Sequence, residues 1–445
     1  MRTSRTGIVV LAGSLALAAC GGVGAEDNPS AGGGAALTTM GFGLPDEIAT
    51  TRVDAFKKAH PEVRLTINQG QFDEQAFLSS VASGNPPDVV YLDRKLLGTY
   101  AARGAIQPLN DCVAKQGIAM SDFYPAAQQQ VKLGDTWYGV PEFYTSIVLL
   151  VNDKAAKEAG ADPASIDTSD WDSLTSLAKK MNKVSGGKIQ RFGFYPKLPE
   201  FLPLWAKANG ADLLSADGRT SHLDDPKVVE ALDYANGLLK AQGGWTKLKA
   251  FTDTFDYFGE RNPITEDQIG MMLTEQFLIT SMAGTSPDAK ITVLPFKDRQ
   301  GNPINNVGGN AWMIPKGAKH PDVACQWMKT MTSADTWLAA AKARAAKRAQ
   351  EGKAYPGTYT GNVKADEAIF SQVVKPTGHE PYDAAIKTIL DVQGKGFIVP
   401  QTPAASEFRS AWLDAATRVT LGRQDARTAL AQAQQEAQKA IEAAG

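Results

Sequence analysis

The chain has 445 residues, of which 43% are hydrophobic and 21% are charged, and its formal net charge is −2. This length exceeds what one small core organises and suits two lobes. The near-zero net charge provides no long-range attraction for nucleic acid or for an anionic membrane surface, so the sequence disfavours both as partners.

The N-terminus has the pattern of a signal peptide. Arg2 and Arg5 precede an apolar run over residues 7–19. The run is too short to span a hydrocarbon core of ~30 Å, but it suits the apolar part of a signal peptide. We therefore expect residues 1–19 to be a signal peptide and the protein to be exported.

Cys20 directly follows small residues, which resembles the bacterial lipobox, in which the cysteine is lipidated. An ordinary signal peptide followed by an incidental cysteine is the alternative. Residues 20–36 are rich in Gly, Ala and Ser and have no apolar period. We expect them to be a flexible lipid-anchored tether with a reach of roughly 20–25 Å. The expected location is the extracytoplasmic face of the bacterial cell membrane.

From residue 36 to Asp93 the sequence alternates in strand, helix, strand, helix, strand order. Residues 37–42 predict a strand, and Ala49 and Val53 then mark one face of a helix. The last strand is a buried run that ends in Asp93. This order is typical of a parallel sheet, in which ligands gather at the carboxyl ends of the strands.

The next part of the chain continues the alternation. Residues 147–151 form an apolar run that predicts a buried strand. In the helix predicted over residues 172–181, apolar residues recur at i, i+3, i+4 and i+7, with Ser169 or Asp170 as the N-cap. The last helix is predicted to follow Asp425, which serves as its cap.

Residues 268–333 bring strand ends and exposed chemistry together. A buried strand over residues 269–273 leads into a polar and aromatic corner at residues 275–277. Further on, the glycine pair and Asn310 of residues 308–310 precede a helix that begins at Pro321. Proline suits the first helical position because an N–H there would have no partner. Strand ends that carry such groups indicate a cleft.

Two parts of this stretch carry a family resemblance. The strand with Met271 and Met272 before Phe277 recurs in the carbohydrate-binding group of ABC-importer solute-binding proteins, the maltose-binding-protein-like family, and so does the segment Gly308-Gly309 with Ile314-Pro315-Lys316-Gly317. The chain resembles that family over nearly all of its mature length. The resemblance implies an α/β, two-lobed periplasmic-binding-protein-like fold of type II, with the ligand cleft between the lobes.

The resemblance also implies a division of the chain. The first lobe is expected to take residues 37–146 and 268–337, and the second lobe residues 147–267 and 338–445, which include the C-terminal helices. The Ala-, Lys- and Arg-rich residues 338–353 depart from the short loop that is usual in the family, and we expect them to form a solvated helix face.

Only Cys112 and Cys325 remain after processing. In an exported protein a remaining pair favours a disulfide, and the resemblance places both cysteines in the same lobe. Two free buried thiols are the alternative.

Ligand-binding candidates follow from the chemistry of a sugar and from the positions of the family motifs. Carboxylates and carboxamides match sugar hydroxyls, and aromatic rings match the apolar ring face. Asp93 and Glu275 are the strongest candidates, because packing does not explain a charge at the end of a buried strand. Each single aromatic residue is at least as well explained as core. The candidates are Asp93, Glu142, Tyr144, Thr145, Tyr195, Trp205, Tyr257, Glu275, Gln276, Phe277, Gly309, Asn310 and Arg409.

The sequence lacks the usual catalytic signatures. It contains no H-E-x-x-H, G-x-S-x-G, G-x-x-x-x-G-K-[ST] or C-x-x-C motif. Ser176 to Lys179 fits S-x-x-K, but the companion motifs are missing, so we interpret the match as chance. We expect no enzymatic activity, no metal and no cofactor.

The resemblance implies a lipid-anchored, monomeric receptor that captures a mono- or oligosaccharide between its lobes and delivers it to membrane permease subunits. A glycerophosphate, glycerophosphodiester or amino-sugar ligand is the alternative within the class, and Arg409 with the glycine pair would suit a phosphate. Outside the class, the alternatives are a secreted glycoside-acting enzyme and a structural envelope lipoprotein.

Overall fold

The computed structural model describes residues 35–445 except residue 254. The predicted signal peptide, Cys20 and the tether up to residue 34 lie outside the described residues. Within the described residues, none of the helices combines the length and the apolar character needed to cross a membrane.

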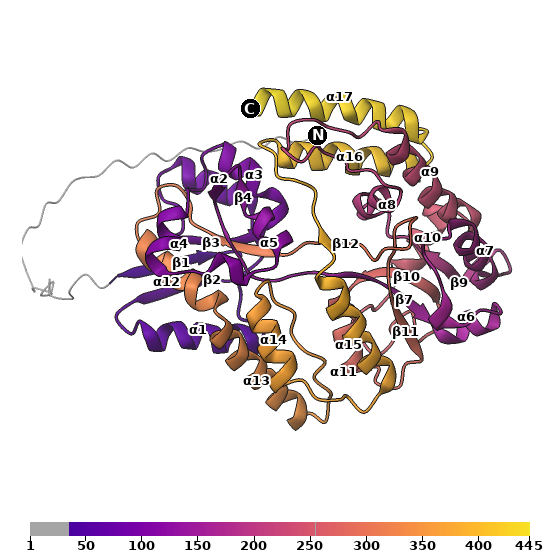
Figure 1. Cartoon of the computed structure of the whole chain (residues 1–445), viewed down its shortest axis with the longest axis horizontal. Helices are drawn as coiled ribbons and strands as arrows, with labels where there is room; N and C mark the ends of the chain where they lie inside the picture. Colours follow the sequence, from indigo (N-terminus) through magenta and orange to yellow (C-terminus); the bar gives the residue numbers. More distant parts are fainter. Residues whose placement is uncertain (1–34, 254) are drawn as a thin grey trace, which may run out of the picture. The chain divides into compact units, whose positions relative to one another are not determined.

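The first lobe is built on a mixed sheet with the strand order β2-β1-β3-β13-β6 (Figure 1). β1 pairs in parallel with β2 and β3, whereas β13 is antiparallel to β3 and β6. The strands are β1 (Ala36–Met40), β2 (Arg64–Asn68), β3 (Val89–Asp93), β6 (Val140–Pro141) and β13 (Asn310–Met313). A two-stranded hairpin, β4 (Lys132–Leu133) with β5 (Thr136–Trp137), belongs to the same lobe.

Helices bury their apolar faces against this sheet. α1 begins after Asp46, whose carboxylate caps the helix by accepting a hydrogen bond from the Ala49 amide at 3.0 Å, and its inner face buries Val53 and Phe56. The helices of this lobe are α1 (Glu47–Ala59), α2 (Glu74–Ala82), η1 (Arg94–Leu96), α3 (Leu97–Ala102), α4 (Asn110–Gln116), η2 (Met120–Asp122), α5 (Pro125–Gln130), α12 (Pro321–Thr332), α13 (Ala334–Gln350) and α14 (Val363–Gln372).

The second lobe has its own sheet, with the strand order β11-β7-β10-β9-β8. Strand β7, between β11 and β10, is antiparallel to both, and all six of its residues are buried, as expected for an unbroken apolar run covered on both faces. β9 and β10 pair in parallel. The strands are β7 (Ile147–Asn152), β8 (Lys183–Ser185), β9 (Lys188–Tyr195), β10 (Ile269–Glu275) and β11 (Ile291–Pro295).

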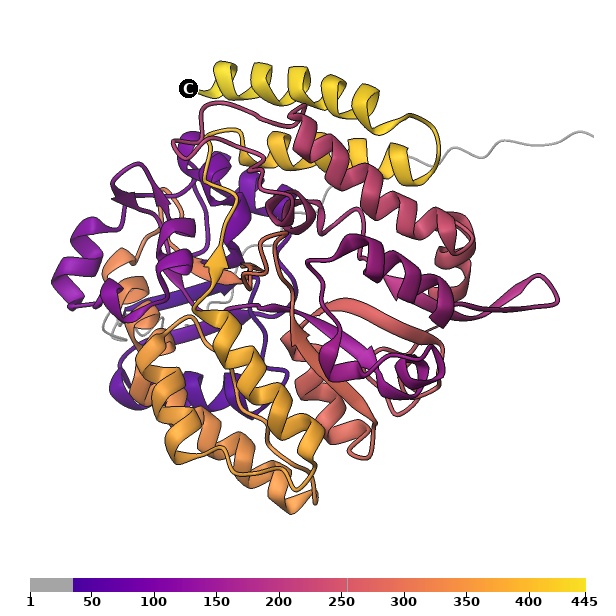
Figure 2. The same ribbon diagram turned by 45° about the vertical axis from the view of Figure 1, so that its right-hand side comes forward.

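The helices of the second lobe cover this sheet and form the C-terminal end. Asp170 caps α7 and Asp425 caps α17, which confirms both predictions. Figure 2 shows α16 and α17 lying side by side, and α16 contacts α3 of the first lobe as well. The helices are α6 (Asp153–Glu158), η3 (Pro163–Ser165), α7 (Trp171–Met181), α8 (Leu202–Ala208), α9 (Pro226–Ala241), α10 (Trp245–Thr252), α11 (Gln276–Thr285), α15 (Glu380–Gln393), α16 (Ala405–Thr420) and α17 (Ala426–Ala444).

Three segments of the described chain connect the two lobes, residues 142–146, 296–309 and 373–379, and we number these crossings in chain order. Residues 394–404 leave α15 and return to α16, so they begin and end in the second lobe. The second crossing runs beside residues 394–404, because β12 (Asn305–Asn306) pairs in parallel with β14 (Gly396–Phe397).

The predicted lobe boundaries at residues 268 and 338 are wrong. β10 and β11 join the second sheet, so the chain stays in the second lobe until residue 295. α13 and α14 pack with α1, so the first lobe extends well beyond residue 337. The reason for both errors is that an apolar strand or an alanine-rich helix carries no local signal of which sheet it will cover.

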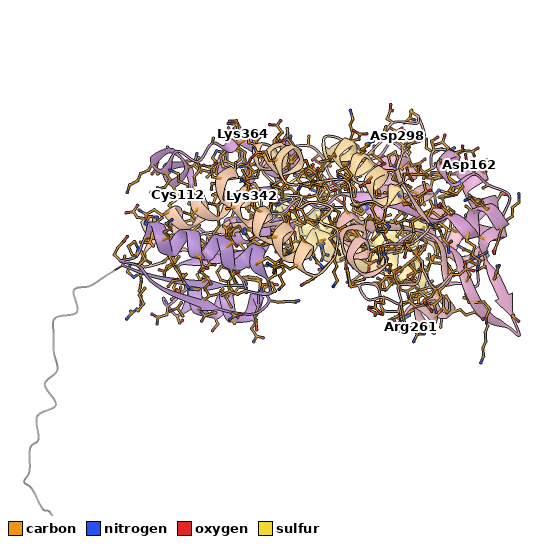
Figure 3. All side chains as sticks on the ribbon, turned by 90° about the horizontal axis from the view of Figure 1, so that it is seen from below. Cys112, Asp162, Arg261, Asp298, Lys342 and Lys364 are labelled. Atoms are coloured by element: carbon orange, nitrogen blue, oxygen red, sulfur yellow. A yellow bond between two sulfur atoms is a disulfide. The ribbon has the colours of Figure 1, made fainter. Side chains whose placement is uncertain are left out.

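A disulfide and the ion pairs of Arg344 connect distant segments of the first lobe. Cys112 of α4 and Cys325 of α12 form a disulfide, with their Cα atoms 5.8 Å apart (Cys112 is labelled in Figure 3). The basic segment lies in α13, and it is only partly a solvated face. Arg344 forms ion pairs with Asp46, at 2.5 Å, and with Glu47 of α1.

Candidate functional site

A cavity of about 290 Å³ lies where the carboxyl ends of β3 and β10 face each other across the crossings. Asp93 ends β3 in the first sheet, and Glu275 ends β10 in the second sheet. Helix α16 closes another side with Arg409 and two aromatic residues. The remaining lining residues are Lys95, Gln130, Thr145, Ile147, Glu200, Phe201, Pro203, Asn306, Val307, Val399, Pro400, Thr402, Ala405, Phe408 and Trp412.

The charged side chains of this cavity form no ion pairs within the described protein. They are three carboxylates and two cations, and among residues 35–253 and 255–445 none of the five forms an ion pair. Lys95 and Glu200 are exposed, and Asp93, Glu275 and Arg409 are half-buried. Charged groups that gather at a cavity and form no ion pair there are available to hydrogen-bond a polar ligand. The five residues are Asp93, Lys95, Glu200, Glu275 and Arg409.

Asp93 is held in place by the start of η1. One of its oxygens, Oδ1, accepts a hydrogen bond from the Lys95 amide at 2.9 Å, so the carboxylate caps the short helix. The other oxygen makes no hydrogen bond within the described part of the chain. The carboxylate is therefore oriented by the backbone and keeps an acceptor for a ligand hydroxyl.

Arg94, the next residue, fastens two crossings beneath the cavity. Its buried guanidinium donates to the carbonyls of Gly308, at 2.6 Å, Asn310, at 2.9 Å, and Phe143, and to Gln130 Oε1 at 3.0 Å. Burial lowers the pKa of Arg94 to about 10, so it stays charged at neutral pH. The predicted site residue Asn310 thus contributes its backbone carbonyl to the frame.

Gly309 allows the first and second crossings to approach each other closely. It has a φ of +136°, and a Cβ atom there would lie 2.1 Å from the Phe143 carbonyl oxygen. The candidate Gly309 does not line this cavity, and the first crossing occupies the space beside it. Thr145 is bound to the neighbouring glycine, since its Oγ1 accepts from the Gly308 amide at 3.0 Å, and it also lines the cavity.

A second cavity, of about 650 Å³, has a different lining. It lies at the ends of β1 and β2 and contains aromatic rings and amides, including Phe42, Gln69 and Tyr359. Phe277 lies at its edge, 43% exposed, and stacks on Phe258, which is 52% exposed. Their ring centroids are 5.8 Å apart and their planes differ by 20°. Exposed stacked aromatics beside a cavity match the apolar face of a sugar ring.

The two cavities share their dividing wall. Glu275 lines the first cavity, and the next residue, Gln276, lines the second. On the first crossing Thr145 lines one cavity and Phe143 the other. Residues two apart on an extended chain lie roughly 7 Å from each other. The two cavities are therefore neighbours on either side of the first crossing and of the end of β10.

Glu142 is structural, and its predicted role in ligand binding is wrong. Its carboxylate is fully buried, pairs with Arg52 Nη1 at 2.9 Å and accepts a hydrogen bond from Trp312 Nε1. Burial raises the pKa of Glu142, while the Arg52 guanidinium lowers it. The pair ties α1 to the first crossing and to β13.

Tyr144 and Gln276 make the hydrogen bonds that hold the first crossing in place. The Tyr144 hydroxyl donates to the Gln393 carbonyl at 2.9 Å, so this buried ring does not reach a ligand as predicted. Gln276 Nε2 donates to the Tyr144 carbonyl at 2.8 Å, and Gln276 Oε1 accepts from the Ser146 amide at 2.5 Å. The Gln276 amide therefore supports the first crossing, although the residue borders the second cavity.

Trp205 is a core residue, contrary to the prediction. It is fully buried, and its Nε1 donates to the Pro196 carbonyl at 2.9 Å. Its ring packs against Trp171 and Phe296, with centroids 6.0 and 5.0 Å away. A tryptophan with a satisfied N–H and aromatic neighbours on its faces has no surface left for a sugar.

Tyr195 and Tyr257 face a cation of the protein itself. Lys197 Nζ lies 5.0 Å from the centroid of the Tyr195 ring and 5.4 Å from that of Tyr257. Burial lowers the pKa of Lys197, while Glu275 and Glu200 raise it. The predicted stacking of a sugar on these two rings is therefore blocked by the lysine in this structure.

Several lining residues escaped the sequence analysis. Lys95 could have been inferred, because it follows Asp93 closely and thus shares the strand end. Phe408 and Trp412 belong to an apolar helix face whose pattern predicts packing, and in the structure the same face of α16 also borders the cavity. Glu200 and Phe201 come from a loop that has no periodic pattern.

Comparison with known proteins decides the class. Residues 51–371 match the model of the bacterial extracellular solute-binding protein family, which is well over half of the chain. The chain belongs to this family. The family resemblance inferred from the sequence is confirmed, and membership places the protein outside the cytoplasm.

One sequence relative and two solved structures illustrate what this chain is similar to. The arabinooligosaccharide-binding protein of Bacillus subtilis is 22% identical over 325 residues, covering 71% of this chain and 72% of that protein. The structure of CpMnBP1 with mannotriose bound has a TM-score of 0.71 and 23% identity, with 91% of this chain and all of the other covered. Maltose-bound MalE3 of T. maritima has a TM-score of 0.68 and 18% identity, with 91% and 99% covered. The predicted two-lobed fold class is confirmed.

Proposed function

We propose that this solute-binding protein is the carbohydrate receptor of an ABC importer. The observation that carries the proposal is the cavity between the ends of β3 and β10, whose charged side chains form no ion pair among the described residues. Carboxylates accept hydrogen bonds from sugar hydroxyls, and Lys95 and Arg409 donate to them. The names of the similar proteins, which bind arabino-, manno- and malto-saccharides, support the same class of ligand.

The charge balance favours a neutral sugar over a phosphate. A phosphate placed among three carboxylates and two cations would face net repulsion, whereas a hydroxyl can donate to the former and accept from the latter. The ammonium group of an amino sugar would be attracted by the carboxylates and repelled by Arg409 and Lys95, so the charge balance argues against a phosphate but not against an amino sugar. A mono- or oligosaccharide remains the proposed ligand, with the aromatic pair Phe258 and Phe277 as a platform for a further ring.

The proposed mechanism is a population shift between lobe arrangements. A sugar that contacts Asp93 in one lobe and Glu275 in the other binds best when the lobes are close together, so it stabilises that arrangement. Lipidation of Cys20 would keep the receptor at the membrane, where the ligand-bound form would dock on permease subunits. The protein would convert nothing, and it would require no cofactor.

A ligand screen tests the proposal. Arabino-, manno- and malto-oligosaccharides, glycerophosphodiesters and amino sugars are each titrated while the melting temperature is followed. A saccharide should raise the melting temperature with its concentration, as a ligand of the native state does. Mass spectrometry of the same wells should return each sugar intact. A product peak would favour the glycoside-acting enzyme instead, and no stabilising saccharide would contradict the receptor.

A further inference from the structure

Asp366 is a carboxyl group buried where the lobes meet. It lies in α14 of the first lobe and is 2% exposed. Its Oδ1 accepts from the Thr360 amide at 2.8 Å, and its Oδ2 accepts from the Tyr124 hydroxyl at 3.1 Å and from Gln393 Nε2 at 3.0 Å. All three donors are neutral, and within the described residues no cation pairs with this carboxyl. A negative charge here is therefore costly.

Gln393 links this carboxyl to the second lobe. It is the last residue of α15 and directly precedes residues 394–404, which run beside the second crossing. Its backbone carbonyl accepts from Tyr144 of the first crossing, and its Nε2 reaches Asp366. Its other amide atom, Oε1, is buried and has no hydrogen-bond partner in residues 35–445 as described. The link thus leaves one buried acceptor unpaired.

Protonation of Asp366 removes the buried charge and keeps the link. A neutral carboxyl group still has acceptor lone pairs for the Thr360 amide and for Gln393 Nε2, and it gains one O–H donor. The neutral acid and the Gln393 amide therefore stay hydrogen-bonded across the two lobes without the cost of a buried, unpaired charge.

We propose that a proton on Asp366 locks the second lobe to the first through Gln393, and that loss of the proton releases the lock. Lobe movement would then respond to pH with or without a bound sugar. The consequence for ligand affinity rests on the proposed function, whereas the movement itself does not.

The direction of the pH response follows from the larger of two opposing effects on the Asp366 carboxylate. Burial raises the pKa of Asp366 to about 7, while the bonds from Thr360, Gln393 and Tyr124 lower it. Moving Gln393 away loses one of those bonds but admits water to the carboxyl. Because burial is the largest effect on this pKa, hydration outweighs the lost bond, and the ionised form favours separated lobes. Acid should therefore favour lobes held together.

The groups around Asp366 do not compete with it near pH 7. Burial raises the pKa of all four facing tyrosines above the ordinary value, so they remain neutral. Lys364 on the same helix points to solvent and pairs with Asp122 at 2.8 Å (Lys364 is labelled in Figure 3), and Glu367 is exposed. From neighbouring elements, Arg344 is paired with α1 and Glu142 with Arg52. The four tyrosines are Tyr124, Tyr144, Tyr355 and Tyr359.

Small-angle X-ray scattering of the sugar-free protein tests the lock. The radius of gyration of the wild type should increase between pH 5.5 and pH 8.5, with a midpoint near 7 that follows the pKa. Asp366→Asn mimics the neutral acid, so its radius should stay at the low-pH value throughout. Gln393→Leu cuts the link but keeps the carboxyl, so its radius should show no step.

Tyr124→Phe is the matched control. It removes one donor to the carboxylate but keeps the link between the lobes, so the step should persist with its midpoint moved to higher pH. A wild-type radius that is equal at pH 5.5 and 8.5, or a step that survives in Asp366→Asn, would overturn the proposal.

Sugar affinity provides the second readout. For whichever of maltose, mannotriose and arabinotriose binds, the Kd of the wild type should rise about fivefold or more from pH 5.5 to 8.5, and that of Asp366→Asn should not change. Failure of all three sugars to bind would count against the receptor function and leave the scattering result standing. Binding at a constant Kd, together with an unchanged radius, would remove the lock alone.

Discussion

The guanidinium of Arg94 and the carbonyl oxygen of Gly308 lie 2.6 Å apart at the floor of the interlobe cavity. Through this contact, and through bonds to Phe143 and Asn310, one side chain holds the first and second crossings together. Because Arg94 directly follows Asp93, the same short segment joins the first and second crossings and presents the carboxylate that we propose to bind the ligand. The geometry of the site therefore depends on a residue that faces away from it.

Replacing Arg94 should destabilise the fold. Arg94→Met leaves several buried carbonyls without a donor, and we expect the free energy of unfolding to fall by about 3–5 kcal/mol. Arg94→Lys should lose less, since an ammonium keeps some of these bonds but lacks the planar fork. Urea denaturation measures both. The exposed Arg103, which pairs with Glu407, is the control, and Arg103→Met should cost no more than about 1 kcal/mol.

Neutralising either site carboxylate should weaken sugar binding. In Asp93→Asn and Glu275→Gln a charge-assisted hydrogen bond becomes an ordinary one, so the Kd should rise about tenfold or more, with little change in melting temperature. Titration calorimetry measures the Kd. Asp135→Asn and Glu380→Gln, two exposed carboxylates outside both cavities, should bind as the wild type does. Equal affinities in all four variants would contradict the assigned site.

The aromatic pair should distinguish sugars by length. Phe277→Ala removes the ring that stacks on Phe258, and we expect a loss of about 0.5–1.5 kcal/mol for a ligand that reaches the second cavity. A monosaccharide confined to the first cavity should be affected less. The measurement is the ratio of Kd values for the mono- and trisaccharide of one series. Leu421→Ala, another exposed apolar residue, should leave that ratio unchanged.

Asp366 should make stability depend on pH. Its pKa of about 7 lies above the ordinary value for an aspartate, so between about pH 4 and 7 the folded state holds a proton that the unfolded state has released. The stability from this group is complete below pH 4 and is lost as the pH rises toward 7, by up to about 4 kcal/mol. The stability of Asp366→Asn relative to the wild type should therefore be greater at pH 8 than at pH 4.

Unfolding free energies of the two proteins at pH 4, 6 and 8 give this difference, in which titrations elsewhere cancel. A difference that does not vary with pH would show that Asp366 keeps its charge in the folded protein.

The parts of the fold that the sequence predicted were those set by local chemistry. Capping by Asp170 and Asp425 and the start of α12 at Pro321 depend on neighbouring backbone, and all three are confirmed. Asp93 and Glu275 were recognised because a charge at the end of a buried strand has no packing role, and both line the cavity.

The errors concern pairings between distant segments. Glu142 has the sequence context of a site residue, but its charge is used by Arg52, ninety positions earlier in the chain. Tyr144 and Trp205 were chosen as aromatic residues on segments that the family resemblance places beside the cleft. Their polar atoms, however, already have backbone partners. The lobe of β10 depended on its pairing with β7 and β9, which no feature within the strand encodes.

Titration calorimetry of arabino-, manno- and malto-oligosaccharides into the wild type and the Asp93→Asn/Glu275→Gln double variant tests the central claim most directly. We expect at least one saccharide to bind the wild type with a single-site isotherm, to be recovered intact, and to show a Kd at least tenfold higher with the double variant. No heat with any saccharide, or equal affinity for the two proteins, would contradict a sugar held between these carboxylates.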